Sequence, residues 1–175
     1  SKVGSTGQWK PRIGWNTELD ARGTKTVVAW NENDLTSSIP QWGGTAIIAQ
    51  GDSTKWAAGA GKDPTGLGRW TWTRYKRSNN TFLRFVSVYR PVNNPTHQSS
   101  AYAKQKAYLL SCDDDRCPRD AILEDLGTEI DTWLDNGDSL IICGDWNEDV
   151  KVDPIHSFFE DRGLSNLIFQ LHDPS

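Results

Sequence analysis

The feature that most constrains the fold is the run Thr81–Pro91, "TFLRFVSVYRP", which carries apolar side chains at both odd and even positions. Successive side chains of a β-strand point to opposite faces of its sheet, so a strand with this pattern needs cover on both sides. The preceding run, Arg69–Lys76, alternates between a face that carries tryptophan and a face that carries threonine. Turn residues at Lys76–Asn80 join the two runs, and we therefore expect an antiparallel hairpin that Pro91 ends.

The remaining periodic segments predict further strands and helices on either side of this hairpin. The expected strands are residues 24–30, 43–51, 55–60 and 140–143. The expected helices are residues 99–110, residues 119–136 and a segment from Asp153–Pro154 to Arg162–Leu164. Pro118 suits the first turn of the second helix, and Gly137 suits the position just past its end. Strands, then helices, then a strand and a helix predict an α/β layered sandwich.

Length and charge set limits on the class of protein. A chain of 175 residues is long enough for one domain with a real core, so we expect residues 1–175 to form a single domain, with residues 1–23 irregular. The net charge of −4 argues against a protein that binds nucleic acid mainly through bulk positive charge. A nuclease stays possible, because bound metal cations change the local field. The apolar runs are too short to cross a bilayer.

The cysteines indicate a reducing environment. Their number is odd, and Cys143 falls in a segment that we expect to be a buried strand. We therefore interpret all three as reduced thiols of an intracellular protein, with a Cys112–Cys117 loop disulfide as the alternative. The chain contains no methionine and begins at Ser1, which suggests a fragment or a processed chain.

The stretch "SLIICGDWNEDV" is the first candidate for chemistry. A short apolar strand ends at Gly144 and is followed by Asp145 and, two residues later, Asn147. A carboxylate can act as a general base or metal ligand, and an amide can donate to a developing oxyanion. Taken alone, the same residues are also typical of an ordinary turn. We interpret the next two acids, Glu148 and Asp149, as solvated loop or cap residues.

Two further segments could meet a phosphate. The stretch "SVYRP" ends a strand with Tyr89 and Arg90, both of which can donate hydrogen bonds to phosphate oxygens. A tyrosine and an arginine at a strand end are also common in ordinary edge structure. The segment Gly59–Gly66, "GAGKDPTG", lacks the spacing of a phosphate-binding P-loop and is expected to be a turn. It could still bring Lys62 near a phosphate as part of a substrate-facing loop.

In order along the chain, "GGTAI", "GRW", "SVYRP" and "GDWNEDV" resemble the endonuclease/exonuclease/phosphatase superfamily, which includes type I DNases and apurinic endonucleases. The family pattern has a glycine-rich strand, a strand ending in Tyr-x-Pro, a helix, and a strand ending in Gly-Asp-Phe-Asn. Trp146 stands here in place of the usual phenylalanine. The motif sequences are most similar to those of family members linked to retroelements and of uncharacterised relatives. The resemblance runs from about Trp30 to Leu164.

The resemblance implies a DNase I-like sandwich of mixed, mainly antiparallel sheets with flanking helices, and a phosphodiesterase that depends on Mg²⁺ or Mn²⁺. Asp145 would orient or deprotonate the attacking water. Asn147 would hold that water or the phosphate, and Tyr89 would hydrogen-bond the phosphate. Arg90 and Lys62 would contact the substrate, and Gly144 would allow a close backbone approach. DNA is the leading substrate, with RNA or a small phosphoester as alternatives.

Two family motifs have no counterpart in the sequence. The early strand that carries a metal-binding glutamate does not match the surroundings of Glu18 or Glu32, and His172–Asp173 lacks the strands that precede the family's closing histidine. We therefore expect a piece of the domain that is truncated at both ends, with its metal ligands unknown.

Two other classes of function stay open. One is a scaffold or nucleic-acid-binding remnant of the same fold without catalysis. The other is a carbohydrate-binding β-sandwich, in which some of the nine tryptophans would be exposed and stack on sugars.

Overall fold

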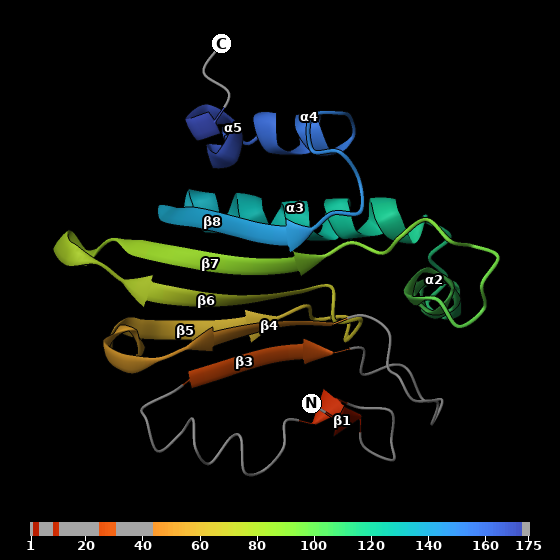
Figure 1. Ribbon diagram of the computed structural model, residues 1–175, viewed down its shortest axis with the longest axis horizontal. Helices are drawn as coiled ribbons and strands as arrows, with labels where there is room; N and C mark the ends of the chain where they lie inside the picture. The colour runs from red at the N-terminus through yellow and green to blue at the C-terminus, as the bar shows by residue number, and fades with distance from the viewer. Residues whose placement is uncertain (1, 4–8, 11–24, 31–43, 173–175) are drawn as a thin grey trace.

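The computed structural model describes residues 2–3, 9–10, 25–30 and 44–172 (Figure 1). The predicted irregular segment 1–23 lies mostly outside these residues, as do Glu18 and Glu32. Within that segment, the short strands β1 (Lys2–Val3) and β2 (Trp9–Lys10) pair in antiparallel fashion.

A mixed four-stranded sheet forms the centre of the described structure (Figure 1). In sheet order its strands are β5 (Ala57–Lys62), β6 (Trp70–Lys76), β7 (Phe82–Tyr89) and β8 (Asp138–Asp145). The first three are antiparallel, which confirms the predicted β6–β7 hairpin, and β8 is parallel to β7. Parallel neighbours need a crossover, and the helices α2 (Ala101–Ser111) and α3 (Pro118–Asp135) provide it.

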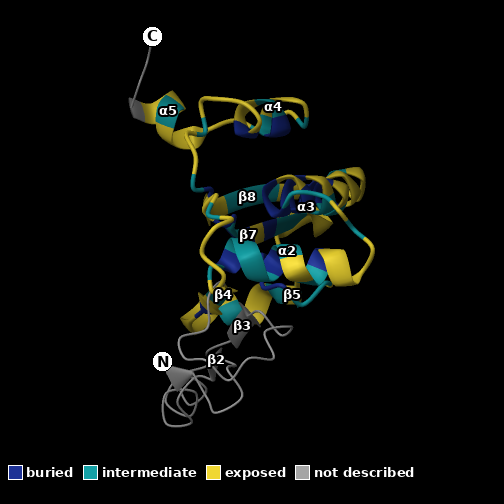
Figure 2. Ribbon diagram, turned by 90° about the vertical axis from the view of Figure 1, so that its right-hand side faces the viewer, coloured by how far each residue is buried: buried dark blue, intermediate teal, exposed yellow. Residues whose placement is uncertain are grey.

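The central sheet is covered on both faces, as the pattern of β7 predicts. The antiparallel strands β3 (Lys25–Trp30) and β4 (Gly44–Ala49) form a second, two-stranded sheet. β4 contacts β6 and β7 on the side of the sheet opposite the helices (Figure 2). Thr71 and Thr73 in β6 are buried although they alternate with the helix-facing Trp70, which shows that the second face is covered. The architecture is therefore mixed α/β in layers.

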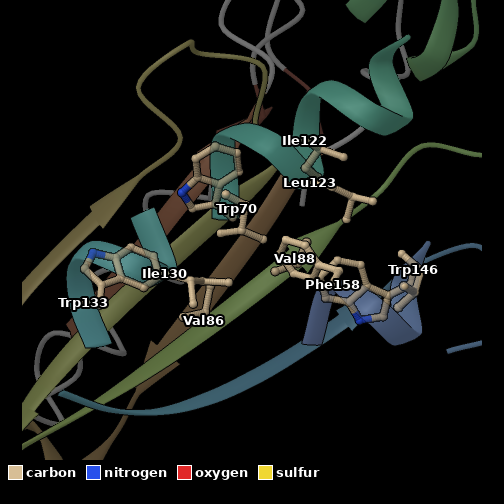
Figure 3. Close-up of a cluster of buried hydrophobic side chains, with 11 residues drawn as sticks. Trp70, Val86, Val88, Ile122, Leu123, Ile130, Trp133, Trp146 and Phe158 are labelled. Carbon is tan, nitrogen blue, oxygen red and sulfur yellow. The ribbon is translucent and has the colours of Figure 1, made fainter. Parts of the chain in front are cut away.

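The main core lies between α3 and the central sheet (Figure 3). The predicted apolar face of α3 is confirmed, and Trp70, Val86 and Val88 meet it from the sheet. The buried α3 residues of this cluster are Ile122, Leu123, Leu126, Ile130 and Trp133. Pro118 is the first residue of α3, and Gly137 follows its end with a φ of 76°, a backbone conformation that favours glycine.

Two segments differ from the sequence-based expectation around β5. The predicted strand 55–60 begins two residues later, because one stretch of 3₁₀-helix, η1 (Gly51–Trp56), precedes β5. Gly59 and Gly61, which were expected in a turn, belong to this strand instead, whereas Gly66 lies in the turn that follows it. A Cβ at Gly61 would lie 2.6 Å from the ring of Trp72, so the glycine-rich composition makes room for an indole on the neighbouring strand.

The C-terminal part of the described chain contains α4 (Ile155–Glu160) and α5 (Leu167–His172). α4 lies where a helix was predicted, but its N-cap residue is Pro154 and not the expected Asp153. The Asp153 carboxylate, one residue earlier, accepts a hydrogen bond from the Ser157 backbone N–H in the first turn. α5 was not predicted, because its apolar side chains Leu167, Ile168 and Leu171 are exposed and follow no burial pattern. Within the described ranges, no helix has both the length and the apolar character needed to span a bilayer.

Candidate active site

Three strands of the central sheet end at the same edge (Figure 1). β5 and β7 are both antiparallel to β6, and β8 is parallel to β7, so the three strands run in one direction. Their last residues are Lys62, Tyr89 and Asp145. Tyr89 and Asp145 are direct partners in the β7–β8 ladder. The structure therefore places two of the three predicted catalytic residues side by side.

Tyr89 and Asp145 also share one face of the sheet. Val86 and Val88 point into the core beneath α3, so Tyr89, the next residue along the strand, points to the opposite face. Asp145 is the register partner of Tyr89, and its side chain therefore points to the same face as the Tyr89 side chain. Asp145 is exposed, and Tyr89 is partly buried. Burial raises the pKa of the Tyr89 phenol, and the negative charge of Asp145 raises it further. The phenol is therefore a neutral hydrogen-bond donor at physiological pH.

Gly144 permits the close approach of the two strand ends. A Cβ at this position would lie 2.8 Å from the carbonyl oxygen of Val88 and 2.9 Å from its Cβ. Any side chain would push β8 away from β7 at the position next to Asp145. The close approach expected at Gly144 is thus a contact with the neighbouring strand.

Asn147 reaches the same place through a turn beyond the strand. Its φ is 49°, and its backbone N–H donates to Oδ1 of Asp145 over 3.1 Å. Its side-chain Nδ2 donates to the backbone oxygen of Arg90, over 2.7 Å, at the end of β7. Trp146, between the two site residues, is buried against Phe158 and Phe159 of α4 and anchors the turn. The stretch is therefore a turn, which brings the Asn147 backbone N–H to the Asp145 carboxylate and the Asn147 side-chain amide to the end of β7.

Arg90 does not lie where a substrate could reach it. Its side chain is 2% exposed, and its Nε donates to the backbone oxygen of Arg119 over 3.0 Å. Its Nη1 forms an ion pair with Glu148. Glu148 is exposed and lies in the loop, as interpreted, but its carboxylate also binds buried arginines, whereas the exposed Asp149 accepts a local hydrogen bond from the Lys151 N–H. The sequence shows two acids in a row and cannot show which of them a buried arginine binds.

Lys62 lies at the same edge as Tyr89, with β6 between their strands. Its side chain is exposed, and the next residue, Asp63, is buried. Asp63 accepts from Nε of Arg69 over 2.7 Å, and the backbone oxygen of Arg69 accepts from the Tyr89 N–H over 2.8 Å. The turn after β5 therefore holds Tyr89 in place.

The Asp63–Arg69 ion pair is a feature of the site that could not be expected from the sequence. Arg69 is 1% exposed and also reaches Asp125 in α3, over 2.8 Å. The Asp63 side chain additionally caps its own turn by accepting from the Thr65 N–H and hydroxyl. Asp-Pro-Thr-Gly predicts the turn. No local pattern indicates that the aspartate is buried against an arginine six residues away.

Cys143 is exposed, two residues before Asp145 on the same strand, and the expectation that it is buried is wrong. Among the described strands, β8 is the last of its sheet, so its outer edge is uncovered. Cys112 and Cys117 are free thiols, and the alternative loop disulfide is not formed.

A divalent metal was predicted, and the described residues do not complete a site for one. Within residues 2–3, 9–10, 25–30 and 44–172, no three His, Cys, Asp or Glu side chains cluster so as to hold an ion. Asp145 is available as one oxygen ligand, whereas the nearby Glu148 is occupied by arginines.

Comparisons with families of known proteins, with curated proteins and with solved structures found no match. The family resemblance therefore rests on the order of the four sequence motifs.

Proposed function

We propose that the chain is part of a phosphodiester hydrolase of the endonuclease/exonuclease/phosphatase type, acting in the cell as an endonuclease on DNA with Mg²⁺ or Mn²⁺. The observation that carries this proposal is the pairing of Tyr89 with Asp145 at the common edge of β7 and β8. The Asn147 amide, hydrogen-bonded to the end of β7, completes the group.

The layered architecture supports a DNase I-like fold. Two sheets face each other, and helices cover the outer face of the larger sheet (Figure 2). "SVYRP" and "GDWNEDV" lie at adjacent strand ends although 55 positions separate Arg90 from Asp145.

The side chains suggest a division of roles. The exposed carboxylate of Asp145 accepts a proton from water as the water oxygen bonds to phosphorus. The protonated Tyr89 phenol donates a hydrogen bond to a phosphate oxygen and stabilises its developing charge. The leaving oxygen departs with the electrons of the broken P–O bond and takes a proton from solvent. Asn147, fixed by its turn, orients the water or the phosphate.

The tryptophans favour this proposal over a carbohydrate-binding module. Trp70, Trp133 and Trp146 are buried in the core, and Trp72 packs against it. Among the tryptophans whose side chains the structure describes, Trp56 is the exposed one, at 60%. One exposed indole does not make the flat strip that stacking on a sugar chain requires.

The proposal is tested by nicking of supercoiled plasmid DNA with Mg²⁺ or Mn²⁺, compared with EDTA. Asp145→Asn should lower the metal-dependent rate about 100-fold or more, because the general base is lost. Asp149→Asn is the matched control, since it removes a charge from the same turn and keeps an acceptor for the Lys151 N–H. Equal cleavage by both variants would refute the role of Asp145, and DNA binding without cleavage would favour the non-catalytic remnant.

A further inference from the structure

We propose that Glu148 is a positioning residue that locks the Asp145–Asn147 turn against the end of β7 through two buried arginines. The positional part depends on contacts alone, and its catalytic consequence rests on the proposed function. Asp145 is the last residue of β8, the outermost strand of the described sheet, and Asn147 lies on the turn that follows it. The β-ladder ends at Asp145, so other contacts must hold the turn.

The first link is a single carboxylate shared by two guanidinium groups. Oε2 of Glu148 accepts from Nη1 of Arg90 and, over 2.6 Å, from Nη2 of Arg119. Both arginines are buried, at 2% and 8% exposure. Burial lowers the pKa of Arg90, and the neighbouring Arg119 charge lowers it further. Two buried cations this close need an anion, and within the described residues Glu148 is the carboxylate that binds both.

The second link joins these arginines to the site. The backbone of Arg90 donates to the backbone oxygen of Asp145 over 2.9 Å and accepts from Nδ2 of Asn147 over 2.7 Å. Arg119, the second residue of α3, donates to the backbone oxygen of Pro91 over 2.7 Å. Its Nη2 also donates to the backbone oxygen of Asn147 over 3.4 Å. Helix, strand end and turn thus meet around one carboxylate.

The ionised form of Glu148 is the one that binds both arginines and so holds the turn. The hydrogen bond from Arg90 lowers the pKa of the Glu148 carboxyl. A carboxyl whose pKa is lowered in the folded state stabilises the fold above its unfolded pKa, and this stabilisation disappears as pH falls through the folded value. The turn is therefore locked at neutral pH and should loosen only in acid.

The experiment compares Glu148→Ala and the isosteric Glu148→Gln with the wild-type chain. Glu160→Gln is the control, because that carboxylate is 72% exposed and its ion pair is with the neighbouring His156. Hydrogen–deuterium exchange is measured on peptides covering residues 145–150. Exchange there should rise about tenfold in Glu148→Ala and less in Glu148→Gln, which keeps an acceptor oxygen, while peptides of α3 beyond its first turn stay unchanged.

In the nicking assay, kcat should fall about 10- to 100-fold in Glu148→Ala with KM changed less than about threefold, since the turn is displaced and the substrate-binding surface is kept. Unchanged exchange in residues 145–150 for both variants would overturn the inference, whatever the activity. If exchange rises in the variants but the wild-type chain does not cleave DNA, the positioning role of Glu148 is supported and the proposed function is refuted. If Glu148→Ala does not fold, the same criteria are applied to Glu148→Gln.

Discussion

Replacing Gly144 by alanine tests whether the approach of β8 to β7 creates the site. The added Cβ would lie 2.8 Å from the Val88 carbonyl oxygen, where ordinary contact begins at 3.4 Å. The strand ends must therefore separate by roughly half an ångström, because the obstacle is backbone that cannot rotate away. Overpacking of this kind costs about 1–3 kcal/mol, which in a chain of this size lowers Tm by about 2–12 °C.

The same displacement should also slow the nicking of plasmid DNA at temperatures where the variant is fully folded. A shift of this size between Tyr89 and Asp145 is expected to lower kcat about tenfold or more, measured well below the Tm of the variant. Cys143→Ala is the matched control, since it changes the adjacent, exposed side chain of the same strand. If Gly144→Ala melts and cleaves like the wild type, the close approach is not required and the reasoning fails.

Two further substitutions test the surroundings of Tyr89. Tyr89→Phe should lower kcat about 100-fold by removing a donor to the phosphate, without lowering Tm. Since the pKa of Tyr89 is raised, the wild-type rate should hold through moderately alkaline pH and fall as pH rises through that value, and the variant should lack this fall. Asp63→Asn should destabilise the chain by about 3 kcal/mol in urea unfolding, because Arg69 stays buried. The exposed Asp52→Asn should leave the unfolding midpoint unchanged, and a similar loss in both would show that burial is not the cause.

Most of the framework could be predicted because it depends on local periodicity. The β6–β7 hairpin, the apolar face of α3 and the order of elements follow from patterns within a dozen residues. The convergence of Tyr89 and Asp145 was implied by the motif resemblance and not by local periodicity, because no pattern within either segment shows that β7 and β8 are neighbours. α5 and the exposure of Cys143 did not follow, since both depend on which surfaces lack a covering element.

The charged groups behind the site could not be predicted. Glu148 and Asp149 are adjacent acids after a strand, yet only Glu148 meets the two arginines, which arrive from β7 and α3. Arg90 follows Tyr89 directly, but its side chain is buried. It therefore binds Glu148 beneath the site and does not face a phosphate. Pairings of this kind are set by tertiary packing over more than 25 positions of sequence, and residue types alone do not reveal them.

The most direct test of the central claim is a double-mutant cycle between Tyr89 and Asp145, measured as metal-dependent nicking under single-turnover conditions. If the two residues serve one reaction centre, Tyr89→Phe and Asp145→Asn should each lower the rate about 100-fold, and the double variant should be far less impaired than their product. Fully multiplicative effects, or a wild-type rate in either single variant, would contradict a shared site at the ends of β7 and β8.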